Sequence, residues 1–157
     1  MKKLKNPFAD LPGYYCFGCS PHNDHGLQME FFEDGEEVVS TWDPARFYQG
    51  YINMLHGGIQ STMMDEIASW VVFIKLKTGG VTSRLTSRFR KPVMLDKGPI
   101  TLRAKLVDQR RNIAEIHVSL FNSNGELCAE SVAEYFVLTS EKARSEMNFP
   151  GTEAFYE

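Results

Sequence analysis

A single long stretch of helical periodicity, at residues 57–77, most constrains how this chain can fold. The segments on both sides alternate instead with the period of two that is typical of strands. A lone helix with no second helical layer has to be covered by the sheet itself. The sequence therefore predicts an α+β fold, in which a curved antiparallel β-sheet wraps around one central α-helix. The apolar stripe of this helix recurs at spacings of three and four, as Ile59, Met63, Ile67, Trp70 and Ile74.

Turn residues and composition suggest the remaining boundaries. With 157 residues, the chain fits one domain spanning residues 1–157. We expect residues 1–26, which are rich in Pro, Gly, Cys and His, to form an irregular N-terminal strap. We expect residues 139–157 to form a C-terminal tail. Two strand-like runs precede the helix and four follow it, at residues 27–34, 36–43, 81–93, 100–108, 113–122 and 126–138.

Composition excludes several classes of protein. Apolar residues make up 43% of the chain and charged residues 24%, as in ordinary soluble globular proteins. The net charge of −3 gives no signal for nucleic acid, and no run approaches the roughly 20 apolar residues of a membrane span. The chain has three cysteines and no secretory signal at its start, which fits a reducing cytoplasm. We therefore expect a cytoplasmic protein that binds neither nucleic acid nor membranes.

A second row on the predicted helix is small and mostly polar, and it consists of Gly58, Thr62, Asp65, Ser69 and Val72. Small side chains let a ligand or another chain approach closely, and Asp65 is the single acid of the row. Glu66 is rotated by about 100° from Asp65 around the helix axis, so we expect it to be solvated or at an edge. A carboxylate on an otherwise apolar helix favours a functional site, and a structural acid bonded to a loop N–H is the alternative for Asp65.

Three segments together carry a family resemblance. "HGGIQSTMMDE" places Asp65 nine positions after His56, at the start of the predicted helix. "CFGCSPHNDHGLQMEF" in the strap and "TSRFRKPV" in the strand after the helix accompany it. In combination they resemble the hotdog-fold acyl-CoA thioesterases of the phenylacetyl-CoA thioesterase type, over roughly residues 14–138. The predicted strand order agrees with that fold.

The resemblance implies a hydrolase that cleaves an acyl-CoA thioester into free acid and coenzyme A. No cofactor is implied beyond the coenzyme A of the substrate. The Gly57 N–H, at the helix N-terminus, would stabilise the oxyanion, and Asp65 would act as general base or as nucleophile. Thr82 matches a Ser/Thr that orients the attacking water. In the family, two subunits complete one site, so a homo-oligomer is implied, either a dimer or a dimer of dimers.

The chain also departs from the family pattern. Some members carry an asparagine six positions before the histidine, where this chain has Gly50. Asn53 is the nearest candidate to replace it. His56 and Gly58 are expected to contact substrate, and a loop-structuring role is the alternative for His56. Glu66 is the second carboxylate of the pair and a further candidate for substrate contact.

The segment 84–111 carries nine Lys or Arg and only two Asp in a chain of negative net charge. A solvated sheet face is the simplest interpretation of this pattern. A local basic surface also suits the phosphates of coenzyme A, and Arg88, Arg90 and Lys91 are the candidates for binding them. Alternation along residues 81–93 places Thr82 and Arg88 on the face opposite to Leu85.

The strap raises a rival interpretation based on metal. Cys16, Cys19, His22 and His25 are zinc-ligand types at C-x-x-C-x-x-H-x-x-H spacing. They are more crowded than the ligand pairs of a structural zinc site, and the family resemblance accounts for both cysteines without metal. We therefore expect the strap to be metal-free.

Two other functions stay open. A hydratase or dehydratase of acyl thioesters shares the fold, but it needs a catalytic histidine beside an acid. No histidine lies on the body of the predicted helix, and His117 has the alternation of an ordinary strand residue. A non-catalytic subunit that binds acyl thioesters is the second alternative, because a fold alone does not decide function.

Overall fold

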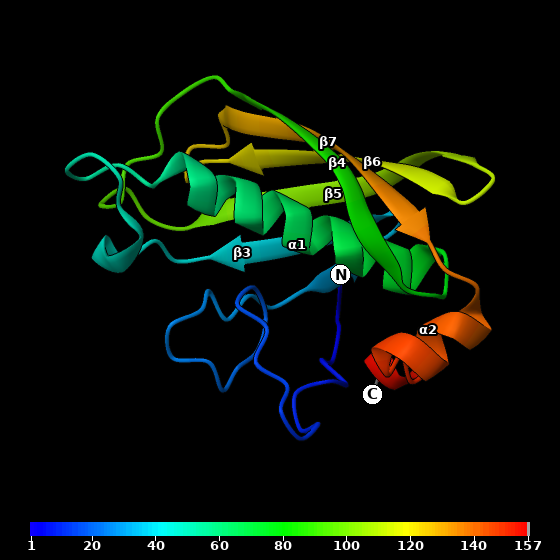
Figure 1. Cartoon of the computed structure of the whole chain (residues 1–157). Coiled ribbons are helices and arrows are strands. Elements are labelled where there is room, and N and C mark those ends of the chain that lie inside the picture. Colours follow the sequence, from blue (N-terminus) through cyan, green and yellow to red (C-terminus); the bar gives the residue numbers. More distant parts are fainter. Residues whose placement is uncertain (157) are drawn as a thin grey trace.

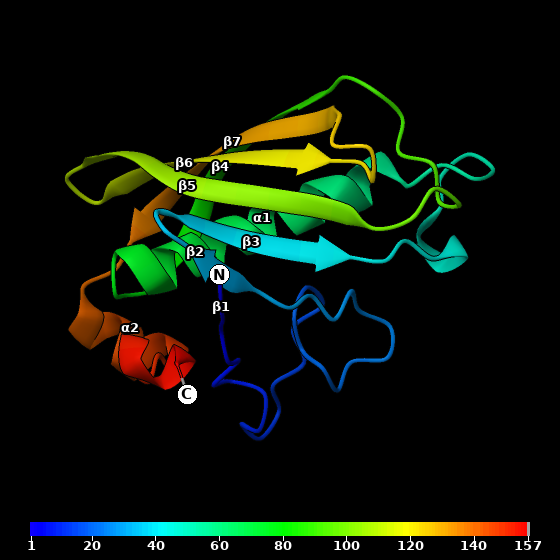
Figure 2. The ribbon, with the colours of Figure 1, turned by 180° about the vertical axis from the view of Figure 1, so that it is seen from behind.

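The computed structural model describes residues 1–156 and contains one seven-stranded sheet (Figures 1 and 2). The strands lie in the order β1-β2-β3-β5-β6-β7-β4, and every neighbouring pair is antiparallel. Six of them correspond to the predicted strands, and β1 adds a short seventh at the edge. Their bounds are β1 Lys2–Lys3, β2 Phe32–Asp34, β3 Glu37–Trp42, β4 Gly80–Phe89, β5 Ile100–Arg110, β6 Ile113–Phe121 and β7 Leu127–Val137.

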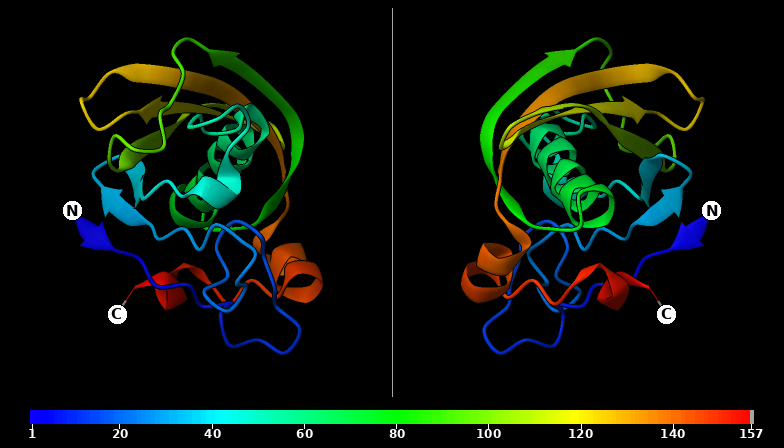
Figure 3. Two further views of the ribbon diagram at one scale, coloured as in Figure 1. Left: turned by 90° about the vertical axis from the view of Figure 1, so that its left-hand side faces the viewer. Right: turned by 90° about the vertical axis from the view of Figure 1, so that its right-hand side faces the viewer.

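The sheet curves around the long helix α1, Gly57–Lys75, as the two views along the helix show (Figure 3). This confirms the predicted fold class. A short 3-10 helix, η1 Arg46–Tyr48, lies in the loop before α1. The buried side of α1 fills the core with side chains that are almost fully inaccessible: Met63, Met64, Ile67, Trp70, Val71 and Ile74. The helix ends at Lys75, two residues before the predicted end at Lys77, and Lys77 itself has a left-handed φ of 58°.

The N-terminal strap is irregular, as expected, but it is held firmly in place. β1 pairs with β2, and the backbone N–H groups of Leu27 and Met29 donate to the Phe17 and Gly18 carbonyls at 2.7 and 2.9 Å. The strap passes below α1 in Figure 1. It therefore covers a part of the helix that the sheet leaves open.

The C-terminal segment is more ordered than the tail predicted for residues 139–157. It contains α2, Ser140–Met147, and the 3-10 helix η2, Thr152–Phe155. Thr139 caps α2 at one end, and Asn148 ends it with a left-handed φ of 57°. Phe149 and Phe155 stack on Phe73 of α1. The segment thus extends the aromatic core, and no helix within residues 1–156 is both long and apolar enough to cross a membrane.

Strand β4 forms one edge of the sheet and bonds only to β7. Most of its residues are exposed, including Val81 at 49% and Phe89 at 50%. A ten-residue edge strand with exposed apolar side chains is a surface on which another strand can pair. Within one chain, therefore, the helix face beside β4 stays open on one side.

Candidate active site

The Asp65 carboxylate is held by two hydroxyl groups that come from neighbouring strands. Thr82 of β4 donates to Asp65 Oδ1 at 2.9 Å, and Tyr135 of β7 donates to the same oxygen at 2.6 Å. The Tyr135 hydroxyl also lies 2.8 Å from the Asp65 backbone carbonyl. Within residues 1–156, Oδ2 receives no hydrogen bond. One oxygen is therefore fixed, and the other is free to act on a substrate or a water molecule.

A β-bulge explains how Thr82 reaches Asp65. Simple alternation would put Thr82 on the opposite face from Leu85, but the β4–β7 register shifts between Thr82 and Arg84. The extra residue, Ser83, turns Thr82 onto the helix-facing side, which it now shares with Leu85. The predicted face of Thr82 was therefore wrong, while its role in orienting a water molecule stays a prediction.

Tyr135 is a site residue that the sequence analysis missed. It pairs with Thr82 across the two strands and is only 2% exposed. Burial, and then the charge of Asp65, raise the pKa of the Tyr135 phenol far above its usual value, so it stays a donor. The available signal was weak: a tyrosine on a strand whose other inward-facing residues are small, such as Ala129 and Ala133.

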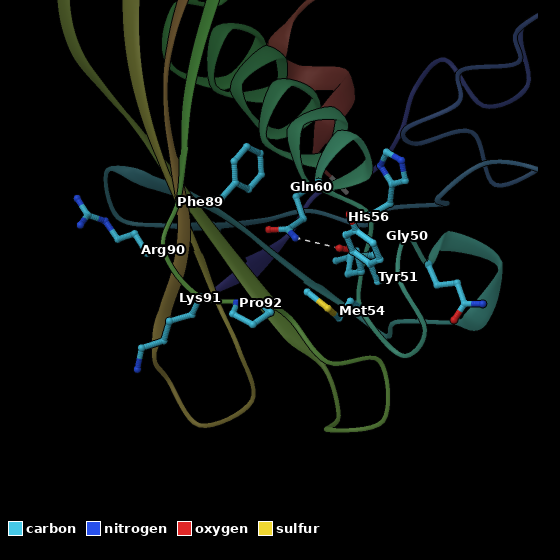
Figure 4. Close-up of a pocket in the computed structure, with 12 residues that line it drawn as sticks. Gly50, Tyr51, Met54, His56, Gln60, Phe89, Arg90, Lys91 and Pro92 are labelled. Atoms are coloured by element: carbon cyan, nitrogen blue, oxygen red, sulfur yellow. Dashed lines mark hydrogen bonds between the residues drawn. The ribbon is translucent and has the colours of Figure 1, made fainter.

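The N-terminus of α1 presents backbone donors to an open cavity. The His56 ring caps the helix, since its Nδ1 accepts from the Gly58 N–H at 2.9 Å. The Gly57 N–H meets no hydrogen-bond acceptor within the described part of the chain. Gly57 lines a cavity of about 780 Å³ together with His56, Gln60 and Phe89 (Figure 4). The helix start therefore offers an unpaired N–H and a positive dipole end to whatever enters.

Gln60 is a second residue that sequence reasoning overlooked. Its side chain is 4% exposed and lies between His56 and Phe89 in Figure 4. Gln60 Nε2 donates to the Leu55 carbonyl at 3.2 Å, which fixes the orientation of the amide. Gln60 Oε1 has no partner in residues 1–156. A buried acceptor without a donor costs free energy, and at the wall of a cavity it is suited to a ligand N–H or O–H.

Other predicted binding residues have partners of their own. The Asn53 side chain donates to Asp96 at 3.0 Å and does not line the cavity, so it does not take the place left by Gly50. Arg90 and Lys91 line the cavity, but their charged ends point away from it in Figure 4. They pair with acids of the neighbouring β7 segment, Glu130 at 2.9 Å and Glu126 at 2.5 Å. Arg88, near the end of β4, forms no ion pair within residues 1–156.

Glu66 lies on another side of α1 from Asp65 and is neither solvated nor in the cavity of Gly57. Its carboxylate is 3.5 and 3.7 Å from the Cys16 thiol of the strap. Burial, and then Cys16, raise the pKa of the Glu66 carboxyl to about 7. The two histidines of the strap do not join this group, and His22 instead lies 3.5 Å from Asp10.

Asp65 and Gly57 are separated along the helix. Eight residues of α-helix span about 12 Å along the axis, too far for both groups of one chain to act on one carbonyl. Asp65 is also absent from the lining of the 780 Å³ cavity. The Asp65 carboxylate and the unpaired Gly57 N–H of one chain therefore lie at different places on α1.

The chain belongs to the thioesterase superfamily, whose family model matches residues 52–129. The match includes the helix start, Asp65 and strands β4 to β6. A protein of Saccharolobus solfataricus that is named as a candidate esterase is 26% identical over 97 residues. The aligned region covers 60% of this chain and 63% of that protein, so it spans less than two thirds of the relative's length.

Solved structures agree with this assignment. A hypothetical thioesterase of Streptococcus pneumoniae, solved with coenzyme A, is 26% identical and has a TM-score of 0.66. The similarity covers 71% of this chain and 90% of that one. A protein of Streptococcus mutans bound to acetyl-CoA shares the fold with a TM-score of 0.67 at 19% identity, over 83% of this chain and 98% of that one. The pneumococcal protein has also been solved with a single aspartate, or a single threonine, replaced by alanine.

Proposed function

We propose that the protein hydrolyses an acyl-CoA thioester to a free acid and coenzyme A. The observation that carries this proposal is the Asp65 carboxylate, with two hydroxyl donors on Oδ1 and an unoccupied Oδ2. A carboxylate held in this way can accept a proton from water or attack a carbonyl carbon through its free oxygen. The pairing of an aspartate with a threonine is in keeping with the two residue types replaced in the pneumococcal relative.

The reaction can be written with Asp65 as general base. Asp65 Oδ2 takes a proton from water while the water oxygen bonds to the thioester carbon. The carbonyl oxygen becomes an oxyanion, which the Gly57 N–H stabilises at the positive end of α1. Collapse of this intermediate breaks the C–S bond, and the leaving thiolate recovers the proton from Asp65. One thioester and one water thus give one carboxylic acid and one thiol. As a nucleophile, Asp65 would instead form a mixed anhydride that water then cleaves.

The site requires two subunits in this proposal. The 12 Å between Asp65 and Gly57 on one helix is bridged when Asp65 of one chain faces the Gly57 of its partner. The exposed edge strand β4 supplies the surface for that contact, since it carries Thr82 next to Val81 and the bulge. We expect an obligate homo-oligomer, a dimer or a dimer of dimers. Light scattering that showed a stable 17.9 kDa monomer at micromolar concentration would contradict the shared site.

Coenzyme A is the thiol carrier that the surroundings favour. Two solved relatives contain coenzyme A or acetyl-CoA. In this chain, the 780 Å³ cavity is lined by apolar side chains near Gly57, including Met54 and Phe89, and by the free acceptor of Gln60. Of the three predicted phosphate ligands, Arg88 of β4 is left available, because Arg90 and Lys91, which follow the strand, are engaged by acids.

A thiol-release assay tests the proposal directly. The purified protein is given acetyl-, octanoyl-, palmitoyl-, benzoyl- and phenylacetyl-CoA, and free coenzyme A is followed with a thiol reagent. We expect turnover of at least one class, and its loss in Asp65→Asn. Hydration of an enoyl-CoA without thiol release would indicate the hydratase alternative. Binding of coenzyme A with no reaction of any substrate would indicate a non-catalytic subunit.

A further inference from the structure

A cluster of three acidic groups lies on the side of α1 that faces the strap. It contains the Cys16 and Cys19 thiols and the Glu66 carboxylate, whose ligand atoms all lie within 4.8 Å of one another. Both cysteines are free thiols, and Cys19 is 5% exposed. The strap and the helix thus bring together residues that are 50 positions apart in the sequence.

The cluster lacks any cation of the protein. No Lys, Arg or His within residues 1–156 forms an ion pair with Glu66. Two thiols and a carboxylate placed together without a positive charge are unfavourable once any of them ionises. Asp65, one residue earlier, has hydroxyl donors instead. A bound cation would remove this imbalance on the Glu66 side.

The strap backbone is shaped to admit the Glu66 carboxylate. A Cβ at Gly18 would lie 2.5 Å from Cδ and Oε2 of Glu66, so any larger residue would displace the carboxylate from its place beside the cysteines. The Cys19 sulfur lies 3.0 Å from the Tyr14 hydroxyl, and the Asn6 amide donates to it at 3.6 Å. Donors of this kind around a sulfur are typical of the outer shell of a metal-bound thiolate.

We infer that Cys16, Cys19 and Glu66 bind a divalent cation of the zinc type. Zinc takes thiolate sulfur at about 2.3 Å and carboxylate oxygen at about 2.0 Å, and tetrahedral ligands at these lengths are about 3.5 Å apart. The Cys16 sulfur and the nearer Glu66 oxygen are 3.5 Å apart. Two thiolates among the ligands favour zinc over magnesium or calcium. The ligand set differs from the one the sequence suggested, because Glu66 replaces both strap histidines.

Three protein ligands leave a fourth position, and it opens toward a second cavity. This cavity, of about 480 Å³, is lined by all three ligands and by Tyr14 and Phe73. A water molecule or a small anionic ligand can complete the coordination there. The metal fastens the strap to α1 at the residue next to Asp65, so it acts as a clip on the helix rather than as part of the thioester chemistry.

The test is a cobalt titration of the full-length protein under reducing, oxygen-free conditions after removal of metal with a chelator. We expect about one Co²⁺ per chain, with a thiolate-to-metal charge-transfer band, and displacement of that cobalt by zinc. Cys16→Ser and Cys19→Ser should abolish the band, and Glu66→Gln should keep it while weakening binding by about tenfold or more. The matched control is the double variant His22→Ala, His25→Ala, which should bind as the wild type does.

Several results would overturn this inference. One is a wild-type protein with three titratable thiols and no charge-transfer band at any cobalt concentration. Another is metal binding that survives in the cysteine variants but is lost in the histidine variant. A third is a protein whose mass without reductant is lower by two hydrogen atoms and which binds no cobalt after reduction. That result would identify Cys16 and Cys19 as a redox pair instead. If the cysteine variants do not fold, zinc competition in the wild type and in Glu66→Gln still decides the question.

Discussion

Asp65 receives hydrogen bonds from the hydroxyls of two strands, whereas Glu66, the next residue of α1, lies against the thiols of the strap. The step of about 100° between them places the two acids in different surroundings. Asp65 faces the edge strand β4 and the open side of α1. In the proposed function, a second chain and a thioester approach from this side. Glu66 faces the N-terminal strap, where Gly18 leaves room for its carboxylate.

The comparison shows why an apolar helix can carry two adjacent acids. Each acid contacts groups from a different part of the chain, the hydroxyls of Thr82 and Tyr135 for Asp65 and the Cys16 thiol for Glu66. A hydroxyl pair leaves one oxygen of Asp65 free to react. Two thiols beside Glu66, with no Lys, Arg or His paired to it within residues 1–156, suit metal coordination instead. Exchanging or deleting either acid should therefore give different kinds of effect.

The largest effect should come from Asp65→Asn compared with Glu66→Gln. Both changes keep the shape of the side chain and remove its charge. We expect kcat of Asp65→Asn to fall by about 10² or more with KM little changed, because the lost group acts in the transition state. Glu66→Gln should lower kcat by less than about tenfold, because its group does not touch the thioester. Steady-state kinetics with the best acyl-CoA checks this. Equal losses in the two variants would remove the distinction between the two faces.

Mixed oligomers test whether the Asp65 face is completed by a partner. Gly57→Pro removes the oxyanion N–H at the first helical position, where proline is tolerated, and His56 already has the extended backbone (φ −59°, ψ 132°) that a following proline requires. Gly57→Ala is the matched control, since its Cβ would meet only Phe89 at 3.7 Å and the N–H is kept.

Equal amounts of Asp65→Asn and Gly57→Pro chains, unfolded and refolded together, should regain activity. Half of the dimers are then mixed, each with one intact site of two, so about one quarter of the wild-type rate is expected. Each variant refolded alone should stay inactive, and circular dichroism should show both folded. If the refolded mixture regains no activity although both chains are folded, the whole site lies within one subunit.

The fold was accessible from the sequence because its signals are local or periodic, and one helical period among strand periods was enough for the architecture. The spacing of His56, Gly57 and Asp65 led to the choice of Asp65 as the acid, which stays a prediction. Thr82 was identified by type, but its face was not. The bulge at Ser83 arises from pairing with β7, and the sequence of β4 alone does not indicate it.

Contacts between distant segments could not be predicted from the sequence, because they too depend on pairing between parts of the chain that are far apart. Tyr135 approaches Asp65 from 70 positions away, on a strand whose alternation looks ordinary. Glu66 meets Cys16 across 50 positions, through a strap that has no periodicity to indicate which way its side chains point. The strap's spacing suggested His22 and His25 as companions of the cysteines, and the helix supplied Glu66 instead.

A smaller effect is expected when one of the two hydroxyls on Asp65 is removed. Tyr135→Phe keeps the buried ring and deletes the donor to Oδ1, and Thr82→Val does the same from the other strand. Losing one hydrogen bond to a charged group is worth about 1.5 kcal/mol, so kcat should fall about tenfold in each variant. KM should be almost unchanged. A rise in KM at constant kcat would show that the hydroxyls bind substrate rather than position the carboxylate.

The smallest effect on activity should come from the strap, through Gly18→Ala. The added Cβ would lie 2.5 Å from the Glu66 carboxyl group, so the carboxylate must move away from the cysteines. Overpacking of this kind costs about 1–3 kcal/mol of unfolding free energy, while kcat should stay within about twofold of the wild type. Thermal unfolding and steady-state kinetics measure the two quantities separately.

A double-mutant cycle attributes that cost to Glu66. In a Glu66→Ala background the overlapping atoms are gone, so Gly18→Ala should lose most of its destabilising effect. Gly26→Ala is the matched strap control, because its Cβ would lie 2.4 Å from the Phe17 carbonyl oxygen and does not meet Glu66. Its cost should be the same with or without Glu66. If Gly18→Ala were equally destabilising in both backgrounds, the glycine would serve the strap's own backbone, and the close fit between strap and Glu66 would lose its support.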